Sequence, residues 1–191
     1  MRTGVKASGV AERAVTAYIH GEPPGPPMLN EIYNKRILEL AADIPRLGRL
    51  ERPDASATAH SKLCGSTVTV DLAVEGGVVA DFAHEVKACA LGQASSSIMA
   101  RHVVGSTAAE LRTIRAAMRS MLKEGAAPPA GKWADLQVLE PVRDFKARHA
   151  STLLTFDAVV DALDRIEAKR VEADRTGTDR TEAARAAPAA E

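Results

Sequence analysis

The fold is decided by the stretch Lys62–Met99, which reads KLCGSTVTVDLAVEGGVVADFAHEVKACALGQASSSIM. Residues 67–74 alternate between apolar and polar side chains, and residues 78–86 resume the alternation after the loop Glu75-Gly76-Gly77. This period of two is typical of strands with one buried face, and a short glycine-bearing loop between them predicts an antiparallel hairpin. The apolar face of the hairpin is expected to carry Val68, Val70, Leu72, Val74, Val78, Ala80, Phe82 and Val86.

The segments around this hairpin predict helices. Thr107 and Glu110 match a capping box at the start of one helix, and Gly125 is placed to end it. Residues 47–50 suggest a short edge strand, and residues 52–61 suggest a loop that leads to Cys64. We therefore expect an α+β fold, in which helices cover one side of a small antiparallel β-sheet. Helices are expected over residues 29–44, about 90–103, 107–124 and from about 147 onward.

The composition predicts one domain with a tail at each end. The chain has 191 residues, of which 46% are hydrophobic, and this is enough for a normal core. Residues 1–27 end in a proline-rich run and are expected to form a flexible extension and linker. The domain is expected over residues 28–170. Residues 171–191 lack apolar periodicity and are expected to be a disordered tail.

Charge and composition argue against two classes of partner. The formal net charge is zero, whereas nonspecific nucleic-acid binding needs many cations that neutralise phosphates. Aromatic residues make up 3% of the chain, too few to stack many bases. Apolar runs stay below the roughly 18 residues needed to cross a membrane. The sequence therefore predicts a cytoplasmic protein that binds neither nucleic acid nor membrane.

The two cysteines of the chain, Cys64 and Cys89, lie at the outer ends of the predicted hairpin. Antiparallel strands of similar length bring these ends together, so the two thiols are expected to lie near each other. They are compatible with simple packing, with a disulfide, or with a metal or sulfur site. Gly65 allows close backbone approach beside Cys64. Cys89 directly precedes a predicted helix, whose free N–H groups favour a thiolate.

These residues resemble a known family. Cys64-Gly65, the hairpin, and Cys89-Ala90 followed by Gln93–Ser97 resemble the IscU/SufU/NifU N-terminal family of iron–sulfur cluster assembly scaffold proteins. The resemblance extends from about residue 28 to 166 and includes Phe145–Arg148. The longer connection over residues 128–139 is more similar to the SufU branch.

The resemblance implies a function and a set of partners. It implies a scaffold or carrier protein that binds iron or zinc and accepts sulfur through Cys64 and Cys89. The implied cofactor is a transient iron–sulfur cluster or zinc. The implied partners are a cysteine desulfurase and recipient apo-proteins. Such a protein is expected to be a non-enzymatic scaffold or sulfur acceptor.

The sequence departs from the family pattern at the implied site. Ser66 stands where the family usually has aspartate, and Ser151 stands where it has a third cysteine. A serine hydroxyl stays protonated near neutral pH and is a poor metal ligand. His149 is then the best local candidate for a third ligand, provided that the backbone there is not yet helical. Arg148 matches an arginine of the family and is expected to stabilise thiolates.

Two further interpretations remain open. The residues Arg112, Arg115, Arg119 and Lys123 form a basic stripe, which is either a solvated face or a dock for an acidic partner. The chain itself is a cluster scaffold, a persulfide carrier or desulfurase partner without a stable cluster, or a degenerate paralogue that keeps only the fold. Because one chain supplies two thiolates, cluster binding is expected to be labile and linked to a homodimer or to an added thiol.

Overall fold

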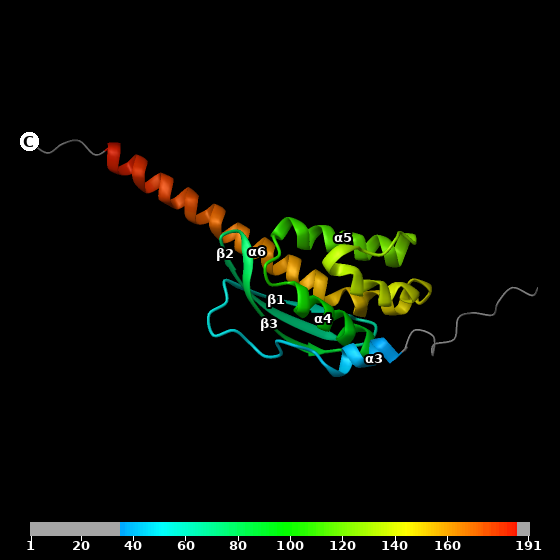
Figure 1. The fold of residues 1–191 in the computed structure, drawn as a ribbon. Coiled ribbons are helices and arrows are strands. Elements are labelled where there is room, and N and C mark those ends of the chain that lie inside the picture. Colours follow the sequence, from blue (N-terminus) through cyan, green and yellow to red (C-terminus); the bar gives the residue numbers. More distant parts are fainter. Residues whose placement is uncertain (1–34, 187–191) are drawn as a thin grey trace, which may run out of the picture.

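The computed structural model describes the backbone of residues 35–186 (Figure 1). The extension predicted over residues 1–27 and the beginning of the helix predicted over residues 29–44 lie outside the described residues. In chain order the elements are α3 (Lys35–Ala42), β1 (Ala55–His60), β2 (Thr67–Glu75), β3 (Val78–Lys87), α4 (Ala90–His102), α5 (Ala108–Glu124), the 3-10 helix η1 (Gly131–Asp144) and α6 (Lys146–Ala186).

The three strands form one antiparallel sheet in the order β1-β2-β3. The predicted hairpin is confirmed, with Thr67 opposite Lys87 at the end that leads to the cysteines. The loop predicted over residues 52–61 is wrong, because Ala55–His60 pairs with β2 as an edge strand. Ala55 and Ala57 are buried in the core cluster, and β1 packs on α6. In place of the edge strand predicted over residues 47–50, Leu47 forms an isolated bridge to His84.

A β-bulge changes which residues of β3 are buried. Ala73 pairs with Asp81 and Val74 pairs with Val79, so Ala80 is an extra residue on β3. Beyond the bulge the side chains change face. Val79 is buried and Ala80 is exposed, the reverse of the strict alternation that the sequence predicts.

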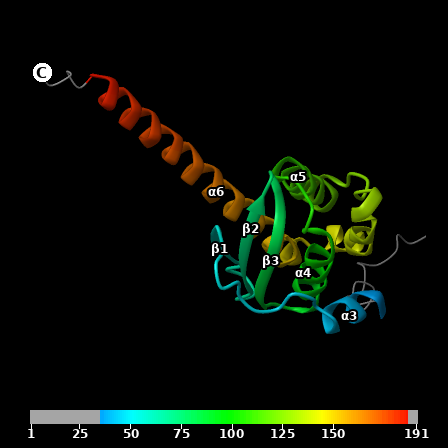
Figure 2. The ribbon, with the colours of Figure 1, turned by 60° about the vertical axis from the view of Figure 1, so that its left-hand side comes forward.

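Helices cover one face of the sheet, which confirms the predicted α+β class (Figure 2). Val68, Val70 and Leu72 of β2 are fully buried beneath them. The predicted helix caps are also confirmed. The N–H of Glu110 donates to Oγ1 of Thr107 at 3.1 Å, and Gly125 ends α5 with a φ of 72°.

The connection between α5 and α6 is the 3-10 helix η1, where the sequence predicts irregular backbone with a short turn. Trp133 is buried in this connection, and its Nε1 donates to Oε1 of Glu110 at 2.7 Å. Trp133 therefore anchors η1 against the first turn of α5.

Helix α6 is longer than the sequence predicts and projects beyond the sheet (Figure 1). Disorder is expected from Val171, whereas the helix continues to Ala186. Alanine, glutamate and arginine are strong helix formers, and Arg175 pairs with Glu172 one turn earlier at 2.9 Å. Although α6 is long, it is too polar to span a membrane, and no other helix in the described part of the chain is long and apolar enough to do so.

Candidate functional site

Cys64 lies in a tight turn that connects β1 to β2. The N–H of Ser61 donates to the carbonyl of Ser66, and the N–H of Gly65 donates to the carbonyl of Ser61, both at 2.9 Å. Gly65 has a φ of 68°, and a Cβ built there meets nothing within 4 Å. The glycine is therefore needed for its left-handed conformation, and not for the close backbone approach that the sequence suggests.

Two serine hydroxyls surround the thiol of Cys64. Its Sγ lies 3.3 Å from Oγ of Ser61 and 3.0 Å from Oγ of Ser66. Hydrogen bonds with Ser61 and then with Ser66 lower the pKa of Cys64 from 9.0 to about 7, because these hydroxyls stabilise the thiolate. Cys64 is also exposed to solvent. An exposed cysteine that is about half ionised at neutral pH is a competent nucleophile.

Cys89 is the N-cap residue of α4 and faces the beginning of α6. Its Sγ donates to Oγ of Ser151 at 3.6 Å. The Oγ of Ser151 in turn donates to the backbone carbonyl of Arg148 at 3.0 Å, one turn earlier on α6. Ser151 is thus held in a fixed orientation beside Cys89.

The close approach of α4 to α6 depends on Gly92. A Cβ at this position would lie 2.8 Å from Cβ of Ala88 and 3.0 Å from the carbonyl oxygen of Ser151. Real Cβ atoms do not come this close, so a side chain here would push the helices apart. Gly92 therefore allows α4 to contact the backbone of α6 at the point where Cys89 meets Ser151.

The structure brings the two cysteines together with the three neighbouring predicted residues, Ser66, Arg148 and Ser151. After Ser61 and Ser66, the Ser151 hydroxyl also lowers the pKa of Cys64, so it lies beside both sulfurs. Arg148 and Cys64 line one open cavity of about 480 Å³. The remaining lining residues of this cavity are Leu63, Phe145, Lys146 and Ala147.

His149 does not join the cysteines. Helix α6 begins at Lys146, so the backbone at His149 is already helical. Two residues along a helix correspond to a rotation of about 200°, which turns His149 away from the side of Ser151. Its Nε2 lies 3.0 Å from the carbonyl oxygen of Arg143 and 3.2 Å from that of Val142. Among the residues whose side chains are described, His, Cys, Asp and Glu form no group of three placed to hold a metal ion.

Half of the basic stripe of α5 is used within the fold. Arg112 donates to Glu167 and Asp164 of α6, and these bonds raise its pKa. The Nε of Arg115 donates to Asp157 at 2.6 Å. These arginines therefore fix α5 on α6, in contrast to the partner dock suggested for the whole stripe. Arg119 lies farther from Asp157, at 3.8 Å. Lys123 has no acidic partner in the described part of the chain.

Two residues of the site are not predicted from the sequence. Ser61 lies three residues before Cys64, a spacing that a turn brings together, but serine is common in loops and gives no specific signal. Gly92 lies within a helix, where glycine lowers helix stability. The presence of such an unfavourable residue is the one sequence signal that this position has a packing role.

Comparisons with known proteins identify a matching family. The family model described as NifU-like N terminal domain matches residues 32–152. The solved N-terminal structure of a nitrogen-fixing NifU-like protein from Brucella abortus is 66% identical, with a TM-score of 0.73, and the match covers 75% of this chain and 99% of that one.

Two more distant proteins extend the comparison. The iron–sulfur cluster assembly scaffold protein IscU of Thermotoga maritima is 26% identical over 135 residues, which are 71% of this chain and 94% of that protein. A candidate scaffold of the SUF system from Fervidobacterium islandicum AW-1 is 21% identical with a TM-score of 0.65, and the match covers 71% of this chain and 99% of that one. At this identity it supports the fold alone. Because the family model covers most of the chain and agrees with the 66% identical structure, this protein belongs to the NifU-like N-terminal domain family.

Proposed function

We propose that this protein is a scaffold for iron–sulfur cluster assembly, which accepts sulfur on Cys64 and holds the growing cluster with Cys64 and Cys89. The observation that carries the proposal is the exposed thiol of Cys64, with its pKa lowered to about 7, in one cluster with Cys89. Membership in the NifU-like family and the similarity to a protein named as an IscU scaffold support the same function.

Sulfur transfer to Cys64 needs a thiolate and access for a partner. The co-reactant is a cysteine persulfide carried by a cysteine desulfurase. The Cys64 thiolate attacks the outer sulfur of that persulfide, so a new S–S bond forms on Cys64 while the old S–S bond breaks. The desulfurase cysteine leaves as a thiolate, and no external oxidant or reductant is required.

Arg148 is placed to assist this exchange. It lines the same cavity as Cys64 and brings the positive charge of a guanidinium to it. A nearby positive charge stabilises both the attacking thiolate and the anionic persulfide that results. We assign Arg148 the role of an electrostatic stabiliser, and not of a metal ligand.

The cluster is the cargo of such a scaffold, and one chain supplies half of its usual ligands. A [2Fe–2S] cluster is commonly held by four thiolates, and Cys64 and Cys89 provide two. Ser66 and Ser151 carry neutral hydroxyls, which bind iron weakly near neutral pH. The other two thiolates would come from a second copy of the chain or from a small thiol. An incomplete ligand set of this kind favours release of the cluster to recipient apo-proteins.

One observation favours a second candidate function. The described residues place no third His, Cys, Asp or Glu beside the two cysteines. Tetrahedral zinc in structural sites takes four such donors, so a single chain is poorly suited to hold it. A protein that carries persulfide sulfur on Cys64 without keeping a metal needs no more than the nucleophilic thiol and its neighbours.

The test uses the full chain, purified without air. The protein is incubated with a cysteine desulfurase and cysteine, and its mass is then measured by intact-protein mass spectrometry. Iron and acid-labile sulfide are measured after addition of ferrous iron. The scaffold proposal predicts one added sulfur and a stoichiometric, labile cluster. Added sulfur without iron would favour the persulfide carrier.

The Cys64→Ser variant is the matched control, because it changes one atom of the side chain. It should gain no sulfur. Equal labelling of this variant and the wild type would contradict the assignment of Cys64. If the wild type took up neither sulfur nor iron, the chain would be a paralogue that keeps only the fold.

A further inference from the structure

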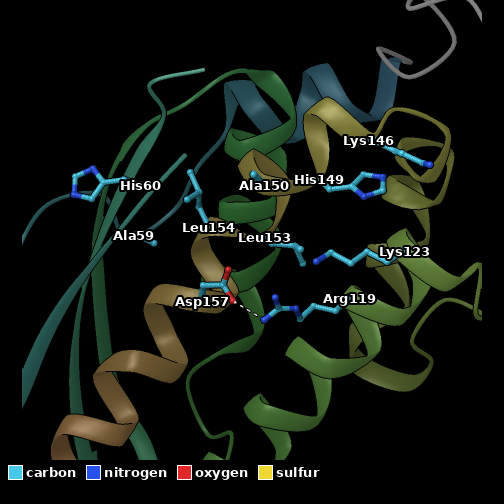
Figure 3. Close-up of a pocket in the computed structure, with 10 residues that line it drawn as sticks. All are labelled: Ala59, His60, Arg119, Lys123, Lys146, His149, Ala150, Leu153, Leu154 and Asp157. Carbon is cyan, nitrogen blue, oxygen red and sulfur yellow. Dashed lines mark ion pairs between the residues drawn. The ribbon is translucent and has the colours of Figure 1, made fainter. Parts of the chain in front are cut away.

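A second cavity, of about 360 Å³, lies between β1, α5 and the first turns of α6 (Figure 3). We call it the basic pocket. It is distinct from the cavity of Cys64, although Lys146 lines both. The lining residues are Ala59, His60, Arg119, Lys123, Lys146, His149, Ala150, Leu153, Leu154 and Asp157.

The basic pocket carries positive charge that the fold does not neutralise. The side chains of Arg119 and Lys123 extend from α5 toward Leu153 and Asp157 of α6 (Figure 3). Asp157 is the one acidic residue in the lining, and it already binds Arg115 at 2.6 Å. Lys123 and Lys146 have no acidic partner in the part of the chain whose side chains are described.

This pairing pattern distinguishes the basic pocket from the rest of α5. Arg112 and Arg115 make ion pairs at 2.5–2.8 Å with α6, whereas Arg119 lies 3.8 Å from Asp157. The C-terminal half of the stripe therefore keeps donors available. The positive end of the α6 dipole, at Lys146, adds to the same field.

The floor of the basic pocket is apolar. Leu153 and Leu154 are buried core residues that line it together with Ala59 and Ala150. Its volume falls within the range of about 300–1,000 Å³ that is usual for small-molecule sites. A ligand that matches both the walls and the floor has several acidic groups on a short carbon skeleton.

We propose that the basic pocket binds a small organic polycarboxylate. One carboxylate would accept hydrogen bonds from the guanidinium of Arg119, and another would pair with the ammonium of Lys123 or Lys146. The carbon skeleton would lie against Leu153. This site is independent of the cysteine chemistry, because none of its assigned contacts involves Cys64 or Cys89.

The experiment titrates the full-length, metal-free chain with citrate, and with inorganic phosphate as an anion that lacks a carbon skeleton. Calorimetry gives the affinity, and backbone amide shifts give the location. Citrate should bind saturably at millimolar concentrations or below, with shifts centred on Lys123, Leu153 and Asp157. Phosphate should bind more weakly.

Three variants make the assignment specific. Lys123→Gln should weaken citrate binding about tenfold, the usual effect of losing one charge-assisted hydrogen bond. Asp157→Asn should strengthen it, since this change removes the carboxylate that competes for Arg119. Lys35→Gln is the control, because the side chain of Lys35 is 92% exposed on α3, away from the pocket. The affinity of this variant for citrate should equal that of the wild type.

Several results would overturn the proposal. The first is absence of saturable citrate binding by a wild-type protein whose circular dichroism spectrum shows that it is folded. The second is an equal loss of affinity in Lys35→Gln and Lys123→Gln, which would indicate nonspecific attraction between charges. The third is phosphate binding as tight as citrate binding, which would exclude recognition of the organic skeleton.

Discussion

The Sγ of Cys89 lies 3.6 Å from the Oγ of Ser151, although the two residues are 62 positions apart in the chain. Ser151 is 1% exposed, and its hydroxyl proton is directed to the carbonyl of Arg148. Because the same hydroxyl also lies beside Cys64, Ser151 occupies the position from which a third donor would reach both thiols. Replacing this one oxygen by sulfur changes the donor set while keeping the side-chain shape.

Ser151→Cys should therefore retain iron and acid-labile sulfide more strongly than the wild type. A third thiolate fills one of the positions that are otherwise open to water or to an external thiol. The measurement is anaerobic reconstitution followed by a timed challenge with a chelator. Ser120→Cys is the control, since it adds a thiol on α5 outside the site. Faster release from Ser151→Cys than from the wild type would contradict the expected role of this position.

Cys89→Ala should abolish cluster retention and leave sulfur transfer to Cys64 largely intact. The variant removes one of two thiolates, whereas the nucleophile and its serine neighbours remain unchanged. Absorbance and mass are measured on the same sample after reconstitution, so that both properties are compared directly. Stoichiometric iron on a Cys89→Ala monomer would refute the two-cysteine site.

The reactivity of Cys64 should rise with pH around a midpoint of about 7, because its pKa is lowered from 9.0 to about 7. Below the midpoint the thiol is protonated and inert, and well above it the rate reaches a plateau. Replacing both Ser61 and Ser66 by alanine should move the midpoint upward, since the hydroxyls that stabilise the thiolate are lost. The rate of alkylation by iodoacetamide, followed by peptide mass spectrometry, measures the midpoint. An unchanged midpoint in the double variant would refute this cause.

Gly92→Ala should destabilise the domain by about 1–3 kcal/mol, the usual range for an overpacked contact. The added Cβ would meet Ala88 and the carbonyl of Ser151 at 2.8 and 3.0 Å. Chemical denaturation measures the free energy of unfolding, and Ser120→Ala on α5 provides a control expected within about 0.5 kcal/mol of the wild type. A Gly92→Ala protein as stable as the wild type would show that the helices separate at little cost.

The features that the sequence predicts correctly depend on local patterns. The hairpin follows from the alternation in residues 67–86, and the capping box and Gly125 mark the ends of α5. β1 is missed because it consists mostly of alanine and serine, which carry a weak strand signal. Its burial comes from α6, where Arg165 donates to the carbonyl of Ser56 across 109 positions. A pattern within a short window of sequence carries no information about a contact between residues so far apart in the chain.

For the site, too, the sequence predicts the features that depend on local patterns and misses those that depend on distant residues. The sequence places Cys64 and Cys89 at one end of the hairpin, and the structure has Ser151 beside both. The direction of His149 depends on whether α6 begins before or after it, and helix boundaries are uncertain by a residue or more. The basic stripe of α5 looks free in the sequence, since its acidic partners Asp157, Asp164 and Glu167 follow 42–55 positions later.

Because α6 projects beyond the sheet, it places an exposed position at a known distance from the site. One continuous helix carries Ser151 at the site and the exposed Thr176 outside the domain. At about 1.5 Å per residue, the two positions are separated by about 38 Å along the helix axis. A fluorophore attached at position 176 would therefore stand clear of a protein docked over the cysteines, yet remain within energy-transfer range of a second dye on that protein. The same helix that completes the site thus offers a fixed point from which the approach of a partner can be measured.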